Sequence, residues 1–312
     1  MKQQLTQEKL EQILMESRPE TQKGATASYI PILKNADPKQ LGVCVIDRSG
    51  RLLKAGDAEC LFTLQSIVKV LIFTCSLLHS GKEKVSEKVS VKPTNEEFNS
   101  IIHLETKNNH KPLNPMINAG AIVCLGFVKG KTMAEKSEHI LDFVRKLAGN
   151  DCIDFDEEVY RSEQESGSRN RALAYYMKST GIIGEEVEVE DLLNAYFRVC
   201  SIRVNCEDIA KIALVYGNNG VDPRRNQRFF SKEIAQLLKA TMVMCGMYDE
   251  SGDVAVRIGL PTKSGVAGGL MSLIPNQMGI GIYGPALDKS GSSIAGLALL
   301  ERLSKYLDAS IF

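Results

Sequence analysis

The two ends of the chain carry short apolar runs typical of β-strands, whereas the stretch between them repeats its apolar side chains at helical spacing. Near the start, residues 41–55 form two such runs around a Ser-Gly turn, which predicts a β-hairpin. Near the end, VAVRIGLP, SGVAGGLMSLIP and MGIGIYGP have a strand-like pattern, and SSIAGLALLERLSKYL predicts a closing helix. Residues 95 to about 210 are chiefly helical in pattern. We therefore expect one α/β unit built from both termini, with a helical region inserted in its middle.

This pattern predicts a single domain over residues 1–312. Its sheet part would come from residues 20–65 and 211–312, and its mainly helical part from residues 66–210. The expected fold class is α/β in the broad sense that includes α+β, with an antiparallel sheet flanked by helices. Leu10, Ile13 and Leu14 recur at helical spacing and predict an amphipathic helix that packs on the body.

Charge and composition narrow the classes of partner. The chain has 38 basic and 38 acidic side chains, a balance that gives no electrostatic case for nucleic acid or an anionic membrane. No run of eighteen apolar residues predicts a transmembrane helix. The charged N-terminal segment lacks the pattern of a secretory signal, so we expect a cytoplasmic protein. The eight cysteines show no close CxxC spacing, and reduced core thiols are the favoured interpretation.

A serine and a lysine stand three residues apart near the start of an apolar segment, residues 62–78, that predicts a buried helix ending near Ser80-Gly81. Ser66 and Lys69 would share a face of this helix, so the hydroxyl and the amine can approach one another. A serine needs a nearby base to attack an amide, and a desolvated lysine is neutral enough to serve as one. The alternative is a capping serine beside a lysine that extends to the surface.

Far downstream, Lys263-Ser264-Gly265 lies in a strand-like stretch rich in glycine. This string is similar to the Lys-Thr/Ser-Gly strand that accompanies Ser-x-x-Lys in penicillin-binding proteins and serine β-lactamases. Small residues there would let the backbone approach a substrate carbonyl, so the N–H groups of Ser66 and Val266 could form an oxyanion hole. The alternative is a tightly packed glycine-rich strand.

Five strings, QSIVK, NPMINAGAI, SEQESGSRN, CGMYD and LPTKSGVAGG, occur in this order. With them the chain resembles the serine-dependent glutaminases, which belong to the β-lactamase and penicillin-binding-protein fold group. The resemblance runs from about Tyr29 to the end. It implies a β-lactamase/transpeptidase-like fold and hydrolysis of L-glutamine to L-glutamate and ammonia through a γ-glutamyl ester on Ser66. It also implies no metal or other cofactor, and a homo-oligomer, either a tetramer or a dimer.

The resemblance also implies roles for individual residues. Ser66 matches the nucleophile, Lys69 its base, and Val266 the second oxyanion donor. The substrate pocket would be lined by Tyr29, Asn118, Glu163, Asn170, Tyr196 and Tyr248. Glu163 would bind the α-ammonium of glutamine in a charge-assisted hydrogen bond. Tyr248 or Tyr29 could relay the proton between serine and lysine.

Each assignment has a structural alternative. Glu163 could be a solvated charge, although SEQESG is expected to break the helical pattern. Asn118 could be a helix N-cap, and the tyrosines could be ordinary core residues. Two other functions stay open: a β-lactamase-like acyl-serine hydrolase, and a glutamine-binding protein without catalysis.

Overall fold

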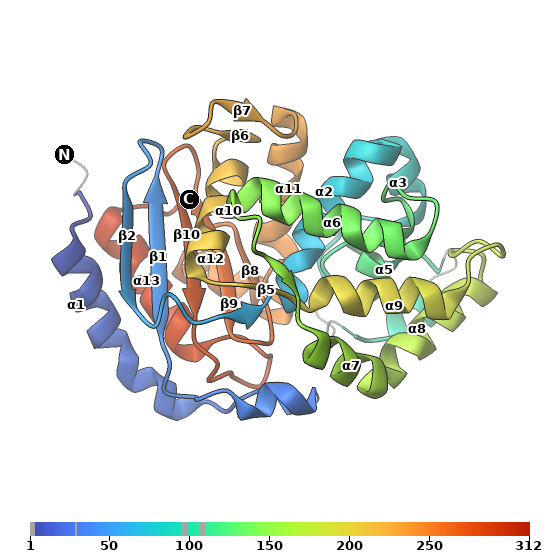
Figure 1. The fold of residues 1–312 in the computed structure, drawn as a ribbon, viewed down its shortest axis with the longest axis horizontal. Helices are drawn as coiled ribbons and strands as arrows, with labels where there is room; N and C mark the ends of the chain where they lie inside the picture. The colour runs from blue at the N-terminus through green and yellow to red at the C-terminus, as the bar shows by residue number, and fades with distance from the viewer. Residues whose placement is uncertain (1–3, 29, 95–98, 107–109) are drawn as a thin grey trace.

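The structure is a computed structural model that describes residues 4–28, 30–94, 99–106 and 110–312 (Figure 1). In these residues the α-helices are α1 (Gln7–Ser17), α2 (Val68–Ser80), α3 (Lys82–Lys88), α4 (Ile102–Thr106), α5 (Asn118–Gly126), α6 (Met133–Ala148), α7 (Glu157–Ser166), α8 (Ser168–Ser179), α9 (Val189–Cys200), α10 (Cys206–Gly217), α11 (Lys232–Cys245), α12 (Ser251–Arg257) and α13 (Ile294–Leu307). The 3₁₀ helices are η1 (Arg18–Lys23), η2 (Pro31–Asn35), η3 (Gln65–Ile67) and η4 (Tyr248–Glu250). The strands are β1 (Gly42–Asp47), β2 (Leu52–Gly56), β3 (Phe62–Thr63), β4 (Asp154–Phe155), β5 (Ile202–Val204), β6 (Val221–Asp222), β7 (Gln227–Arg228), β8 (Thr262–Ser264), β9 (Gly269–Ile274) and β10 (Met278–Tyr283).

The main sheet has five strands in the order β2-β1-β10-β9-β8, and its neighbours pair antiparallel. Val45 of β1 stands opposite Leu53 of β2 and Ile280 of β10, so the N-terminal hairpin lies beside the C-terminal strands. The turn of this hairpin contains Gly50 with a φ of 88°, a conformation that favours glycine. The predicted fold class, an antiparallel sheet from both termini flanked by helices, is confirmed. The predicted boundaries at residues 65 and 211 stay a prediction.

Alternating side chains of the strands serve two separate cores. Val43 and Val45 pack with the apolar faces of α1 and α13, whereas Cys44 and Ile46 belong to the larger core on the other face of the sheet. On that face α10 lies close to β10, because Gly281 has no side chain: a Cβ there would lie 2.1 Å from a carbonyl oxygen of α10. The strand MGIGIY thus uses glycine to bring a helix onto the sheet.

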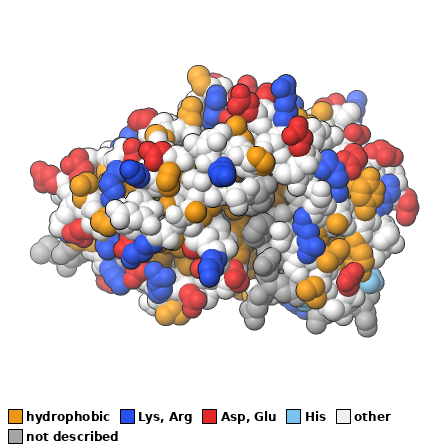
Figure 2. Space-filling view, turned by 90° about the horizontal axis from the view of Figure 1, so that it is seen from below, with side chains coloured by type: hydrophobic (Ala, Val, Ile, Leu, Met, Phe, Trp, Pro, Cys, Tyr) orange, Lys and Arg blue, Asp and Glu red, His pale blue; other side chains and the backbone are white. Residues whose placement is uncertain are grey.

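Beside the sheet lies a helical half of the molecule, on the right in Figure 1, and α2 leads into it from the sheet. All residues of α2 from Val68 to Leu77 are buried, and the helix packs against α5, α6 and α11. Basic and acidic side chains are interspersed over the face shown in Figure 2, without a large region of one sign. Among the described residues, no helix combines the length and apolar character needed to span a lipid bilayer.

Two sequence-based expectations about elements are wrong. The segment 62–78 is not one helix: β3 pairs with β5, η3 follows it, and α2 begins only at Val68. The predicted end is correct, since α2 stops at Ser80 and Gly81 has a φ of 81°. The strand-like VAVRIGLP contains most of α12 instead. The hydroxyl of Ser251, the first residue of this helix, accepts from the N–H of Met247 and donates to the carbonyl of Tyr248.

Candidate active site

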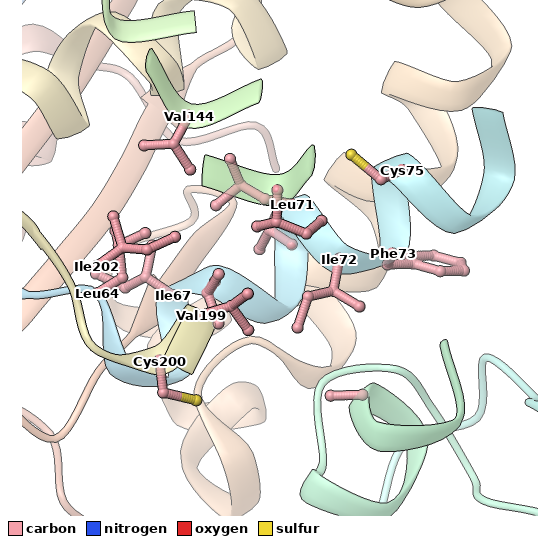
Figure 3. Close-up of a cluster of buried hydrophobic side chains, with 14 of the residues drawn as sticks. Leu64, Ile67, Leu71, Ile72, Phe73, Cys75, Val144, Val199, Cys200 and Ile202 are labelled. Carbon is pink, nitrogen blue, oxygen red and sulfur yellow. The ribbon is translucent and has the colours of Figure 1, made fainter. Parts of the chain in front are cut away.

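Ser66 and Lys69 meet at the junction of η3 and α2. The amine of Lys69 donates to the hydroxyl of Ser66 over 2.9 Å. Lys69 is fully buried, so the alternative of a lysine extending to the surface is wrong. Figure 3 shows part of the apolar surroundings, in which Ile67 lies beside Val199 near the end of α9. Burial lowers the pKa of Lys69 to about 8, and the charge of Glu163 opposes that decrease.

Asn118 connects the lysine to the helical half. Its Oδ1 accepts from the amine of Lys69 at 2.6 Å and from the hydroxyl of Tyr196 at 3.4 Å. Its Nδ2 donates to Oδ1 of Asn170 at 2.8 Å. Asn118 is the first residue of α5 and Ile117 precedes it without a side-chain cap, so the N-cap alternative is wrong. A Cβ at Gly120 would lie 1.9 Å from a loop carbonyl oxygen, so glycine lets the start of α5 pack closely.

Glu163 faces the site from α7, and a sequence-based expectation fails here too. SEQES does not break the helix: α7 continues to Ser166 and presents Glu163 on its buried side. The carboxylate accepts from Nε2 of Gln65 at 2.7 Å. Burial raises the pKa of Glu163 to about 8, while Gln65 and the charge of Lys69 oppose the increase. The alternative of a solvated surface charge is therefore wrong.

Tyr248 approaches Ser66 from the side of the sheet. It begins η4 with a φ of 56°, which is unusual for a residue with a side chain. Burial raises the pKa of its hydroxyl, and hydrogen bonding with the side chains of Ser66 and Ser264 opposes the increase. Ser264 belongs to the edge strand β8, so Tyr248 lies between the sheet and the nucleophile candidate.

The turn after β8 brings Val266 into the same region. Val266 is buried, and Gly265 packs so close to η3 that a Cβ there would lie 2.6 Å from the carbonyl of Leu64. Within the described part of the chain, the backbone N–H groups of Ser66 and Val266 donate to no protein oxygen. The residues from Gly265 to Gly268 form a turn, and the strand that was expected over this segment starts only at Gly269.

The structure thus brings eight of the nine predicted site residues, Ser66 among them, into one region, and the ninth, Tyr29, lies outside the described residues. Sequence reasoning missed two contributors. Gln65 has a φ of 47° and donates its side-chain amide to Glu163. The sequence signal that could have identified Gln65 was its place next to Ser66. Lys263 was noted only as part of a motif. It is fully buried, and its amine lies 4.1 Å from the centre of the Tyr248 ring.

A comparison with protein families supplies the identification. The family model described as Glutaminase matches residues 24–312. The chain belongs to the glutaminase family. Among its relatives, the glutaminase of Clostridium tetani is 52% identical over 308 residues, which cover 99% of this chain and all of the relative. Glutaminase 2 of Clostridium perfringens is 47% identical and matches 97% of this chain and 99% of its own length.

Solved structures of the family have the same fold. A crystal structure of a Bacillus glutaminase is 40% identical and has a TM-score of 0.91, covering 98% of this chain and 99% of its own. A Bacillus subtilis glutaminase in covalent complex with 5-oxo-L-norleucine, formed by reaction with 6-diazo-5-oxo-L-norleucine, is 39% identical with a TM-score of 0.88; the match covers 97% of this chain and 98% of that one. The predicted serine β-lactamase-like fold is confirmed.

Proposed function

We propose that this glutaminase-family protein hydrolyses L-glutamine to L-glutamate and ammonia, with Ser66 as nucleophile and Lys69 as its base. The observation that carries the proposal is the 2.9 Å hydrogen bond from the Lys69 amine to the Ser66 hydroxyl inside a buried site. Burial lowers the pKa of Lys69 to about 8, so a useful fraction of the amine is neutral near pH 7 and can accept a proton.

In the first step, Lys69 takes the proton of the Ser66 hydroxyl, directly or through Tyr248 or Tyr29. The serine oxygen attacks the side-chain amide carbon, and the oxyanion binds the backbone N–H groups of Ser66 and Val266. Both groups are without a protein acceptor in the described residues, which suits this role. The proton held by Lys69 passes to the leaving nitrogen, the C–N bond breaks, and ammonia departs. A γ-glutamyl ester on Ser66 remains.

In the second step, a water molecule gives a proton to the same base and attacks the ester carbon. The ester C–O bond then breaks, and the serine oxygen takes the proton back from Lys69. Glutamate leaves and the enzyme returns to its starting state. The amine thus acts as base and acid in turn, which suits a group whose pKa is near the working pH.

The other end of glutamine would bind across the helical half. Glu163 accepts hydrogen bonds from the α-ammonium, and its buried position strengthens this charge pair. Asn118, Asn170 and Tyr196 form a connected polar group that offers amide and hydroxyl donors to the α-carboxylate. This arrangement selects a free amino acid, because both charged groups of the substrate need a partner.

Ammonia release from glutamine by the purified protein, compared with that of Ser66→Ala, tests the proposal. We expect the variant to lose activity by at least about 10³-fold while still binding glutamate in calorimetry. The intact mass after exposure to 6-diazo-5-oxo-L-norleucine should show one adduct, mapped to Ser66. Undiminished ammonia release by Ser66→Ala would reject the nucleophile. Glutamine binding without ammonia release by the unchanged protein would favour the glutamine-binding alternative, and hydrolysis of a β-lactam in its place would favour the other acyl-serine hydrolase.

The family resemblance also leads us to propose a homo-oligomer, a tetramer or a dimer. Light scattering coupled to size-exclusion chromatography tests this, and a 34.3 kDa species at micromolar concentration would contradict it.

A further inference from the structure

Lys263 is a second fully buried lysine beside the site, and its amine binds two backbone carbonyls. It donates to the carbonyl of Gly246 at 2.9 Å and to the carbonyl of Ser264 at 2.7 Å. Burial and the nearby charge of Lys69 hold the pKa of Lys263 well below its usual range. The two carbonyls therefore accept two hydrogens of the amine.

One of these carbonyls belongs to the turn that carries Tyr248. The carbonyl of Gly246 also accepts from the N–H of Ser264 at 3.4 Å, so strand β8 and the turn are joined twice. A Cβ at Gly246 would lie 1.9 Å from the carbonyl oxygen of Thr262, so the turn packs directly on the strand. Two residues later, the left-handed backbone of Tyr248 holds its ring 4.1 Å from the Lys263 amine.

We propose that Lys263 is a positioning residue that fixes the Tyr248 turn against β8 and so keeps the Tyr248 hydroxyl beside Ser66. This inference rests on the proposed function, because it gives Tyr248 a part in the proton transfer. A left-handed conformation of a tyrosine is strained and persists only where its surroundings enforce it. The buried lysine supplies that constraint through a main-chain hydrogen bond and through contact with the ring.

If Lys263 acts through the Tyr248 hydroxyl, removing the amine matters only while that hydroxyl is present. Lys263→Met keeps a long, unbranched side chain at this position and removes the amine that makes both hydrogen bonds. Lys239→Met is a matched control, since Lys239 is a half-buried lysine on α11 that donates to Asn219.

A double-mutant cycle in ammonia release therefore tests the inference, with the full chain and glutamine as substrate. We expect Lys263→Met to lower kcat by about 10²-fold with KM changed less than about threefold, because a relay hydroxyl out of place slows proton transfer. In the Tyr248→Phe background the same substitution should lower kcat less than about threefold. Lys239→Met should leave both constants unchanged.

Equal losses in the two backgrounds would overturn the inference, because Lys263 would then act independently of the Tyr248 hydroxyl. Should Lys263→Met not fold, two other variants replace it. Lys263→Gln keeps a hydrogen-bond donor and should retain more of kcat than a folded Lys263→Ala. Equal activity of these two variants would also overturn the inference. If the unchanged protein released no ammonia, the proposed function would fail by itself. Crystal structures would then decide the positioning, with Tyr248 leaving its positive φ in Lys263→Met as the expected result and an unmoved Tyr248 as the refuting one.

Discussion

Asn118→Asp places a carboxylate where an amide oxygen now accepts from the Lys69 amine at 2.6 Å. The substitution preserves the size and shape of the side chain. It removes the Nδ2 donor to Asn170 and adds one negative charge next to the proposed base. A negative charge at hydrogen-bonding distance favours the protonated amine, so the pKa of Lys69 should rise. The rate at neutral pH should then fall because less of the base is free.

The size of the effect follows from the pKa of about 8 for Lys69. At pH 7 this pKa leaves about a tenth of the amine neutral. An adjacent opposite charge in a buried site raises a pKa by roughly 1–3 units. With a rise of about two units, only about one molecule in a thousand has a neutral amine at pH 7, a loss of roughly 10²-fold. At pH 10 about half of the amines are neutral, and the charge-dependent loss shrinks to about twofold.

The assay is kcat/KM for ammonia release between pH 6 and 10.5, with Asn118→Ala as the control. The alanine variant also loses the contact with Asn170 but adds no charge. We expect the acid limb of Asn118→Asp to lie one or more pH units above that of Asn118→Ala. Parallel profiles, with the aspartate variant lower by one constant factor throughout, would refute the reasoning, since Lys69 would then not be the titrating base.

Folding raises the pKa of Glu163 from 4.5 to about 8, so the contribution of this group to stability is present below pH 4.5 and is lost as the pH rises to 8. Glu163→Gln should therefore be more stable than the unchanged protein by about 2–4 kcal/mol at pH 9 and nearly equal to it at pH 4.5. Urea unfolding at both pH values measures this difference. Gly281→Ala should destabilise by about 3 kcal/mol or more because its Cβ would meet the backbone of α10, whereas Gly252→Ala, in open space on α12, should stabilise by up to about 1 kcal/mol in the same unfolding assay. Between Tyr248→Phe and Tyr29→Phe, the variant that removes the true proton relay should lower kcat far more than it changes KM, and equal small effects of both would reject a tyrosine relay.

The parts of the fold that sequence could predict are those specified by local pattern. The hairpin around Gly50 consists of two short apolar runs on either side of a turn, and the closing helix α13 repeats its apolar residues with the period of a helix. The Ser66–Lys69 contact follows from a spacing of three residues, which holds even though η3 and α2 divide the segment between them. Strand β3 was missed because its partner β5 lies about 140 residues further on, and no local pattern reports such pairing.

The errors at α7 and α12 have separate causes. In α7 the buried positions include Val159 and, four residues later, Glu163, so a carboxylate stands where the helical pattern calls for an apolar residue. A charged side chain on the inner face thus interrupts the apolar pattern by which this helix could be predicted. In α12 the alternation VAVR imitates a strand. The helix forms because Ser251 bonds to the preceding turn and because Val254 and Ile258 pack on the core beside α13. Tertiary context overrides the local preference there.

Two buried ionisable groups of the site, Glu163 and Lys69, depend on one another. Burial makes both Glu163 and Lys69 favour their neutral forms, and each charge stabilises the opposite charge on the other. On the proposed function, the α-ammonium of glutamine gives Glu163 a closer cation and so favours its ionised form. The negative charge of Glu163 favours protonated Lys69. The α-ammonium offsets this negative charge. The α-carboxylate, which the proposal places beside Asn118, acts on Lys69 in the opposite direction. The two charged ends of the substrate therefore offset one another at the base, and burial remains the main cause of the lowered pKa of Lys69.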